Sequence, residues 1–553
     1  MKHFYLGLAF CIFVSVHSQT KDLFETDLVK NPLHKNHTGK IVFTNRNIAL
    51  DSLKETDFLK TYPLAYNSNL NIRVFMQNSV TNYMHQLAPE LPAETLLNKG
   101  NLQFSFYVDG QFIYKENIHH GCNFGSGGNK NTSTTFRVPL TSTAGEDWWA
   151  MYMWDRFKAN GGEKALTEGK HKLKIEIRLY VQTNENAEAK VGNLIAAGEL
   201  QLLLKTPKLT AKEIKIQEIK PNSDWEISEF PLDKNKIKAL NAEIASHKIK
   251  DVTSVVVIRE GQLLLEEYFN GSNRTTLHDT RSAGKSFAST LMGMAIHDGY
   301  IKDENQTLHD FYDLKSFANY DAKKDSIKIS DLLTMSSAFE GSDANSDSAG
   351  NEENMYPTDN WVKFTLDLPV EKSKINGRQW DYFTAGVVLL GDMIHQKVPG
   401  GLEKYGDEKL FKPLNITSYQ WQYTPQKVAN TAGSLQMTSL DYAKYAQLYK
   451  NNGKWRGQQI IPVSWVQKTL SKQIQIPERN REFYGYLFWN KTFTVDGKDY
   501  ETYYCAGNGG NEFLIFKDLP LVVIVTSKAY NKPYAHPQTE RIVSDFILPA
   551  VLK

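Results

Sequence analysis

Arg281-Ser282-Ala283-Gly284-Lys285-Ser286-Phe287-Ala288-Ser289-Thr290 places a serine and a lysine three residues apart, at Ser282 and Lys285. The apolar residues of this region recur at roughly helical spacing and predict the first turn of an amphipathic helix: Phe287, Leu291, Met292 and Ile296. Positions i and i+3 of a helix lie on one face, one turn apart. The sequence therefore predicts that the hydroxyl and the amine lie within reach of each other.

Such a pair has a defined chemistry. A serine hydroxyl is a weak nucleophile until a neighbouring base takes its proton. A lysine serves as that base only in its neutral form, which burial and nearby cations favour. The start of a helix also directs unpaired backbone N–H groups forward, where a developing oxyanion can use them. The spacing alone also fits an ordinary surface helix, so the segments around it decide between the two.

Composition limits the classes of function. The chain has 553 residues, which allows two to four domains. Hydrophobic residues make up 41% and charged residues 23%, as in a folded globular protein. A formal net charge of +2 gives no electrostatic basis for binding nucleic acid or an anionic surface.

The N-terminus reads as an export signal. Lys2 and His3 precede an apolar run of 13 residues, Phe4 to Val16, which is too short to span a bilayer comfortably. We expect a signal peptide over residues 1–18, cleaved after Ser18, and a secreted or periplasmic protein. A short membrane anchor is the alternative. No other apolar run is long enough to span a membrane.

The cysteines exclude a disulfide scaffold. Cys11 leaves with the signal peptide, so Cys122 and Cys505 permit one disulfide at most. His119-His120-Gly121-Cys122 could bind a metal, but no second pair of ligands follows at a useful spacing. We therefore expect neither a metal nor an organic cofactor.

Residues 40–205 predict an all-β domain. Phe104, Phe106 and Val108 alternate before an Asp109-Gly110 turn, and 171–180 and 192–205 also read as strands. This pattern predicts a β-sandwich of immunoglobulin-like kind. The aromatic run 148–154 is either its core, an inter-domain face or a platform that stacks sugars. A linker over 206–230, rich in Lys, Glu and Pro, follows.

The second domain, 231–553, mixes helices and strands. A helix at 233–247 and strands at 254–258 and 262–268 lead into the Ser282 segment. Further strands come near the C-terminus, at 503–507, 513–516 and 521–526. Strands at both ends with helices between them predict one antiparallel sheet built from the two ends of the domain. The polar loop 341–353 either lines a substrate entrance or is a solvated connection.

Residues from about 230 to 553 resemble the serine β-lactamase and penicillin-binding-protein superfamily, and most of all class C β-lactamases, family VIII esterases and nylon-oligomer hydrolases. The resemblance rests on Ser-x-x-Lys at Ser282 and Lys285, with three supporting stretches: 332–337, 433–435 and 448–453. It implies an α+β domain with an antiparallel sheet and a helical subdomain.

The resemblance also implies roles for single residues. Tyr382 matches the tyrosine of the family's Tyr-x-Asn motif and would share a proton with Lys285, but Thr384 stands where asparagine is usual. Asn508-Gly509-Gly510 occupies the place of Lys-Thr-Gly, so a cation that would hold a substrate carboxylate is missing. The backbone N–H groups of Ser282 and Asn511 would form the oxyanion hole.

These expectations combine into an exported serine hydrolase that forms an acyl-enzyme on Ser282. Its substrate would be a small molecule or peptide with an ester or amide bond, and cell wall is one expected source of it. Neutral esters and amides are expected to be preferred over β-lactams because Asn508 carries no charge. The alternative is a penicillin-binding or sensor protein that is acylated without turnover, or not at all.

Overall fold

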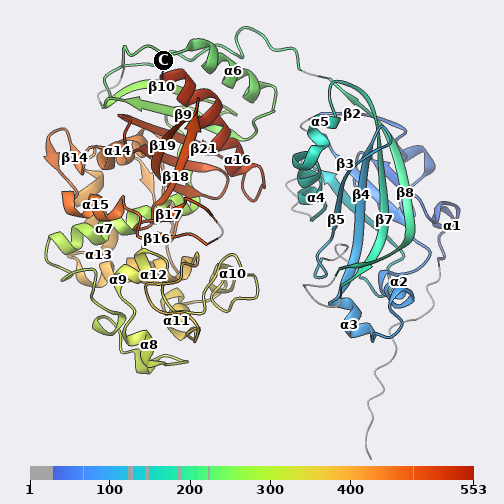
Figure 1. Cartoon of the computed structure of the whole chain (residues 1–553), viewed down its shortest axis with the longest axis horizontal. Helices are drawn as coiled ribbons and strands as arrows, with labels where there is room; N and C mark the ends of the chain where they lie inside the picture. Colours follow the sequence, from blue (N-terminus) through green and yellow to red (C-terminus); the bar gives the residue numbers. More distant parts are fainter. Residues whose placement is uncertain are drawn as a thin grey trace, which may run out of the picture. The chain divides into compact units, whose positions relative to one another are not determined.

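The computed structural model describes most of the chain from residue 29 onward. Described are residues 29–552 except 66–67, 123, 125–128, 143–148, 183–187, 206, 222–223 and 478. The chain divides into two compact units, which meet in the sequence between residues 206 and 207 (Figure 1). The predicted signal peptide lies outside the described residues. Within them, no helix is long and apolar enough to cross a bilayer.

The first unit contains two sheets. The larger sheet has the order β2-β8-β7-β4-β5, and the smaller has the order β1-β3-β6. The bounds are β1 (Ile41–Thr44), β2 (Thr61–Leu64), β3 (Leu70–Phe75), β4 (Gly100–Val108), β5 (Gln111–Asn117), β6 (Thr135–Thr141), β7 (Gly169–Val181) and β8 (Lys190–Leu204). In β7, alternate residues enter the core as the sequence pattern predicts: Leu173, Ile175, Ile177 and Leu179.

Helices also belong to this unit, so the all-β prediction is wrong in part and an immunoglobulin-like sandwich is not confirmed. They are α1 (Pro32–His37), α2 (Val80–Leu87), α3 (Ala93–Leu97), α4 (Trp149–Phe157) and α5 (Glu163–Ala165). The aromatic run folds as α4 because its apolar residues recur at spacings of three and four: Ala150, Met153, Trp154 and Phe157. With 1% of its surface exposed, Trp154 is part of the core and offers no face to a sugar.

The second unit is built on an eight-stranded antiparallel sheet with the order β10-β9-β21-β20-β19-β18-β17-β16. The bounds are β9 (Val252–Arg259), β10 (Gln262–Tyr268), β16 (Ile474–Gln475), β17 (Phe483–Tyr484), β18 (Trp489–Val495), β19 (Lys498–Gly507), β20 (Asn511–Phe516) and β21 (Leu521–Ser527). Strand β21 pairs with β9, which confirms that the two ends of this domain form one sheet (Figure 1).

Helices cover both faces of this sheet, which explains why β9 is apolar over 255–258. Val256 and Ile258 pack with α7 (Ser286–His297), α12 (Thr384–Lys397) and α14 (Ser439–Lys450). Val255 and Val257 point the other way, against α6 (Lys234–Ala245), the π-helix η8 (Ile542–Ile547) and α17 (Leu548–Val551). A strand buried on both faces loses the polar alternation of a half-exposed one.

The remaining helices and short strands lie mainly in the segment between β10 and β16. The longer helices are α8 (Ala322–Asp325), α9 (Ile329–Leu333), α10 (Glu352–Met355), α11 (Trp361–Asp367), α13 (Gly401–Gly406) and α15 (Val463–Thr469). The short strands that the site uses are β11 (His278–Asp279) and β13 (Gln436–Met437), which pair antiparallel. Helix α16 (Ala535–Arg541) precedes η8 near the C-terminus.

The serine segment differs from its prediction in one respect. Residues Arg281–Lys285 form a 3₁₀ turn, η4, which runs directly into α7. Helix α7 is buried on all sides from Ser286 to Ala295, so it is a core helix and not an amphipathic one. Its polar residues are small (serine and threonine), and their hydroxyls are compatible with such a position.

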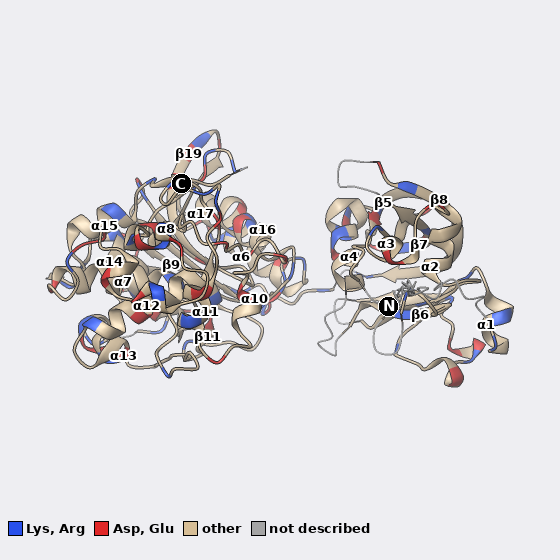
Figure 2. Ribbon diagram, turned by 90° about the horizontal axis from the view of Figure 1, so that it is seen from below, with Lys and Arg blue, Asp and Glu red and all other residues tan. Residues whose placement is uncertain are grey.

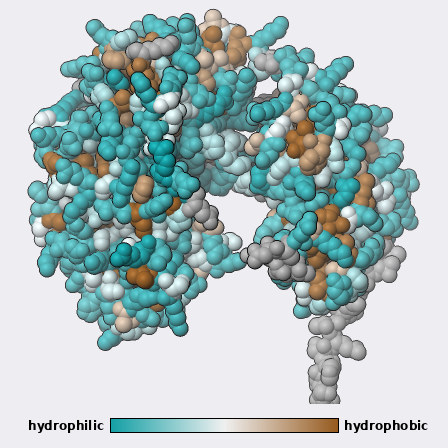
Figure 3. Space-filling view, viewed as in Figure 1, coloured by the Kyte–Doolittle hydropathy of each residue, from teal (hydrophilic) through white to brown (hydrophobic). Residues whose placement is uncertain are grey.

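Charged and apolar residues are distributed over the surface and do not gather in one region of the views shown. Basic and acidic segments are interspersed over both units (Figure 2). On the face shown in Figure 3, apolar area forms separate small patches within a hydrophilic surface. This distribution agrees with the net charge near zero and gives no single-signed face in the views shown.

Candidate active site

Ser282 and Lys285 are in direct contact. Lys285 Nζ donates a hydrogen bond to Ser282 Oγ over 2.7 Å. Lys285 is 2% exposed, whereas Ser282 is half-buried and so retains access from outside. The 3₁₀ turn keeps the two side chains on one face, as the spacing predicts. Arg281, directly before the serine, has φ +51°, a left-handed conformation that is uncommon for a residue with a side chain and is enriched at functional sites.

Close backbone contacts position this turn. A Cβ at Gly507, the last residue of β19, would lie 1.9 Å from the carbonyl oxygen of Thr280, so only glycine fits there. Gly284 likewise packs against the backbone of Gly433. Ser434 N–H donates to the Arg281 carbonyl over 3.2 Å, which brings the 433–435 stretch of the resemblance against the serine segment. The end of β19 and this loop therefore lie on either side of η4.

Tyr382 lies beside the lysine. Lys285 Nζ is 5.2 Å from the centroid of the Tyr382 ring, within the range of a cation–π contact. Two aromatic rings also lie beside Tyr382. It stacks on Trp489 with ring centroids 5.7 Å apart, and its centroid is 6.2 Å from that of Trp380. The structure thus brings Ser282, Lys285 and Tyr382 together from η4 and from the loop before α12.

Thr384 is the first residue of α12 and is 1% exposed. Its backbone N–H donates to the Asp343 carboxylate over 2.8 Å. Its hydroxyl lies near the same carboxylate but makes no hydrogen bond of normal geometry with any described residue. Contact of this hydroxyl with a substrate stays a prediction.

Residues 508–510 form the turn between β19 and β20. Gly509 and Gly510 have φ +94° and +82°, which favours glycine at both positions. The Asn508 side chain is exposed, and its amide is paired with Asn531: its Nδ2 donates to Asn531 Oδ1 over 2.6 Å, and its Oδ1 accepts from Asn531 N–H over 2.8 Å. Asn511 Nδ2 donates to the Asn508 carbonyl, and Asn511 Oδ1 accepts from Ser527 N–H.

These contacts bear on the predicted substrate-binding set. Gly507 places the turn next to the serine segment, as the resemblance requires. The side chains of Asn508 and Asn511, however, hold the turn itself together. A role of Asn508, Gly509, Gly510 and Asn511 in substrate contact stays a prediction, and it would depend on their backbone more than on these two amides.

Arg281, the basic residue directly before Ser282, is paired with a carboxylate. The Arg281 guanidinium lies over the Tyr530 ring at 4.6 Å, and its Nε is 3.5 Å from Asp279. The Asp279 carboxylate also accepts from Arg281 N–H over 3.0 Å. Tyr530 in turn donates to the Asp279 carbonyl. The arginine thus forms a local ion pair beside the turn.

Sequence reasoning missed Asp343, Asn531 and Trp489. Asp343 stood in a polar loop and Asn531 in a C-terminal connection, and nothing in their local sequence relates them to residues 382 or 508. Only the tertiary structure brings each to its partner. Trp489 begins a strand and reads as ordinary core.

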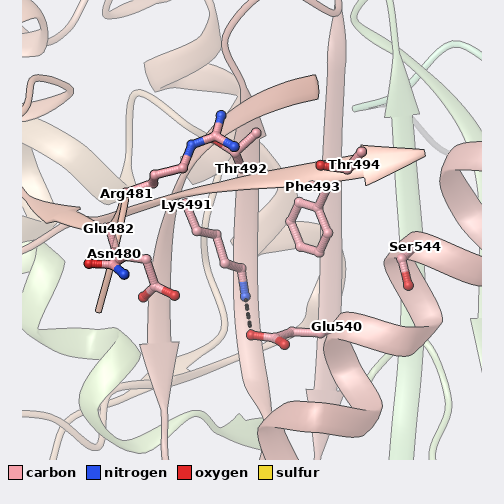
Figure 4. Close-up of a pocket in the computed structure, with 9 residues that line it drawn as sticks. All are labelled: Asn480, Arg481, Glu482, Lys491, Thr492, Phe493, Thr494, Glu540 and Ser544. Carbon is pink, nitrogen blue, oxygen red and sulfur yellow. Dashed lines mark hydrogen bonds and ion pairs between the residues drawn. The ribbon is translucent and has the colours of Figure 1, made fainter. Parts of the chain in front are cut away.

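A cavity of about 290 Å³ lies elsewhere, along β18 and the C-terminal helices (Figure 4). Its lining includes Lys491, which points toward Glu540 and makes ion pairs of 3.1 Å with both Glu540 and the buried Glu512. Burial alone would lower the pKa of Lys491, but the two carboxylates raise it. Ser282, Lys285 and Tyr382 are not among its lining residues. We interpret the Lys491 cluster as structural.

Among the described residues, no group of three or more His, Cys, Asp or Glu side chains is arranged to hold a metal ion. Cys505 is buried and Cys122 half-buried, and each is a free thiol. The chemistry available at the site is therefore that of a hydroxyl, an amine and a phenol.

The family follows from comparison with known proteins. The model of the beta-lactamase family matches residues 241–544, more than half of the chain, so the protein belongs to the beta-lactamase family. This family consists generally of serine hydrolases that act on ester or amide bonds. The matched region contains Ser282, Lys285, Tyr382 and the 508–511 turn. No curated protein matches the chain.

Several solved structures are similar over the second unit. A proposed 6-aminohexanoate-dimer hydrolase from Bacillus anthracis has 18% identity and a TM-score of 0.46, with 61% of this chain and 92% of that one covered. The octameric penicillin-binding protein homologue from Pyrococcus abyssi has 18% identity and a TM-score of 0.43, covering 56% and 78%. A D-stereospecific amidohydrolase from a Streptomyces species has 15% identity and a TM-score of 0.42, covering 53% and 93%.

Proposed function

We propose that this protein is an exported serine hydrolase that forms a covalent acyl-enzyme on Ser282. The observation that carries the proposal is the 2.7 Å contact between Lys285 Nζ and Ser282 Oγ, at a half-buried serine beside a buried lysine. Tyr382 completes the group, with its ring centroid 5.2 Å from Lys285 Nζ. Export follows only from the N-terminal sequence pattern, and detection of the mature chain starting at residue 19 would test it.

The reaction proceeds in two halves. Neutral Lys285 accepts the Ser282 proton as Oγ bonds to the substrate carbonyl carbon, and the carbonyl oxygen takes the negative charge. Collapse of this tetrahedral intermediate breaks the bond to the leaving group, which receives the proton through Lys285 and Tyr382. Water then attacks the ester with the same residues as base, and Ser282 regains its proton. Backbone N–H groups of Ser282 and Asn511 would stabilise the oxyanion in both halves.

The preferred substrates are neutral esters or amides. The turn over residues 508–511 brings no charged side chain to the site. Arg281, the cation beside it, is already paired with Asp279. A substrate carboxylate would therefore lack a charge-assisted hydrogen bond, which is roughly twice as strong as a hydrogen bond between neutral groups.

Turnover of a short p-nitrophenyl ester tests the proposal. Wild-type protein should release many equivalents of p-nitrophenol, and Ser282→Ala should lower kcat/KM by about 1,000-fold or more. Release of a single equivalent followed by arrest would instead support a sensor that is acylated without turnover. Equal rates in wild type and Ser282→Ala would contradict the proposed nucleophile.

A further inference from the structure

We propose that Asp343 is a positioning residue that holds Tyr382 against Lys285. The inference rests on the proposed function, because it concerns the proton transfer assigned to these two residues. Asp343 belongs to the polar loop 341–353, whose role the sequence leaves open. The structure gives it hydrogen bonds to the backbone on both sides of Phe383, the residue after Tyr382.

Three hydrogen bonds fix this corner. Asp343 N–H donates to the Tyr382 carbonyl over 2.8 Å. Asp343 Oδ2 accepts from Thr384 N–H over 2.8 Å, and its Oδ1 accepts from Glu352 N–H over 3.0 Å. One residue therefore holds the chain before and after Phe383, at the start of α12, and ties it to the start of α10. A backbone held at both ends limits where the Tyr382 ring can lie.

The loop that carries Asp343 is itself ordered by internal hydrogen bonds. Asn351 is 6% exposed, and its Nδ2 donates to the carbonyls of Ser342, Asp343 and Asn345 over 3.1–3.3 Å. Ser348 Oγ accepts from Ser342 N–H over 3.0 Å. The loop is thus a compact support and not merely a solvated connection. In the part of the chain that the structure describes, Asn351 makes no hydrogen bond with Tyr382 or Thr384, so it serves as a control within the same loop.

Charged side chains from two other elements face Asp343. Its carboxylate therefore has an electrostatic effect on the site as well as a positioning effect. Burial raises the pKa of Asp343, while the charge of Lys285 in η4 opposes this rise and Glu352 in α10 adds to it. The phenol of Tyr356 faces both carboxylates. An ionised Asp343 carboxylate would favour the protonated form of a base near it. Replacing Asp343 should therefore favour the neutral form of that base.

The test compares Asp343→Ala and Asp343→Asn with Asn351→Ala in the full-length protein. We expect both Asp343 variants to lower kcat for a p-nitrophenyl ester by at least about tenfold with little change in KM, because both oxygens of the Asp343 carboxylate are bonded to backbone N–H groups. The acid limb of their kcat/KM profile should move to lower pH by about half a unit or more. Asn351→Ala should keep the wild-type pH profile. Asp343→Asn retains an acceptor and carries the test if Asp343→Ala does not fold.

Two results would overturn the proposal. Asp343 variants with wild-type kcat and pH profile would show that the carboxylate does not position Tyr382. Asn351→Ala with the same loss and the same shifted profile would assign the effect to loop order and not to Asp343. Failure of the proposed function is distinguishable, because wild type itself would then show no labelling of Ser282 by a fluorophosphonate.

Discussion

Lys285 contacts both of the residues with which it is predicted to exchange a proton. Its Nζ lies 2.7 Å from Ser282 Oγ and 5.2 Å from the Tyr382 ring centroid. Burial of the lysine side chain restricts it to this position. At the scale of single residues, we therefore expect Ser282, Lys285 and Tyr382 to act as one unit in which each member depends on the others.

Loss of either proton-handling residue should cost nearly as much as loss of both. Lys285→Ala and Tyr382→Phe should each lower kcat/KM by about 100-fold or more, and the double variant should add little, because members of a catalytic unit are not additive. Steady-state kinetics on all four proteins measures this coupling. Tyr484→Phe is the control, since that buried ring also packs on Trp489. Independent, multiplying losses would argue against a unit.

The sequence predicted that Ser282, Lys285 and Tyr382 belong to one site but missed the residues that hold Tyr382 and the 508–511 turn in place. Motifs of local sequence mark the three predicted residues. Asp343 and Asn531 form hydrogen bonds with residues 41 and 23 positions away in the chain. No local pattern predicts such pairs, because a polar residue in a loop has many possible partners until the chain is folded.

At the scale of elements, the turn between β19 and β20 depends on three asparagines. Asn508 and Asn531 exchange two hydrogen bonds, and Asn511 ties the turn to Ser527 in β21. The Asn508–Asn531 pair forms a clamp between the turn and residue 531. Its consequence is structural, since it fixes the turn whose backbone flanks Ser282.

Removal of the clamp should destabilise the turn in a coupled way. Asn508→Ala and Asn531→Ala should each lower the free energy of unfolding by about 1 kcal/mol, the net worth of a typical hydrogen bond. The double variant should lose less than the sum, because both single changes break the bond between Asn508 Nδ2 and Asn531 Oδ1. The bond from Asn531 N–H to Asn508 Oδ1 is lost only when Asn508 is replaced. Urea denaturation of the four proteins checks this. Additive losses would show that the two side chains do not stabilise each other.

Elements with a clear period were predictable, and two departures have physical reasons. Strand β7 and helix α6 lie close to their predicted ranges, 171–180 and 233–247. Helix α4 was missed because an aromatic run suits a strand as well as a buried helix, and its spacing was the only guide. Helix α7 was predicted as amphipathic, but its small polar residues are tolerated inside the core.

At the scale of the whole molecule, two buried groups in the second unit have opposite effects on stability. Burial and then the charge of Lys528 lower the pKa of His278 to about 4, from a usual 6.5. Burial raises the pKa of Glu267 to about 7, from a usual 4.5, against hydrogen bonds from Gln217 and Asn241. Between about pH 4.5 and 6.5, the unfolded chain binds more protons at the histidine, and the folded chain binds more at the glutamate.

The sign of each contribution follows from this difference in bound protons. Stability from His278 is present above pH 6.5 and is lost as the pH falls toward 4, whereas stability from Glu267 is present below pH 4.5 and is lost as the pH rises toward 7. Each contribution is about 3 kcal/mol, so the two largely offset each other at mildly acidic pH.

Replacing one group should therefore expose the other. Glu267→Gln should be more stable than wild type at pH 8, and its stability should fall more steeply between pH 6.5 and 4.5. His278→Gln should show the reverse slope over the same range. Urea denaturation at pH 5, 6.5 and 8 measures both. If both variants kept the wild-type dependence of unfolding free energy on pH, burial of His278 and Glu267 would not shift their pKa values as described.

The central claim is that Ser282 is the nucleophile, and mass mapping of a covalent adduct tests it most directly. The full-length protein would be labelled with a fluorophosphonate, digested and analysed by peptide mass spectrometry. We predict one adduct, on the peptide that contains Ser282. It should be absent in Ser282→Ala and retained in Ser286→Ala. Ser286 is the control because it lies nearby in the chain and its hydroxyl donates to the Ala283 carbonyl. An adduct on another residue, or undiminished labelling of Ser282→Ala, would contradict the account.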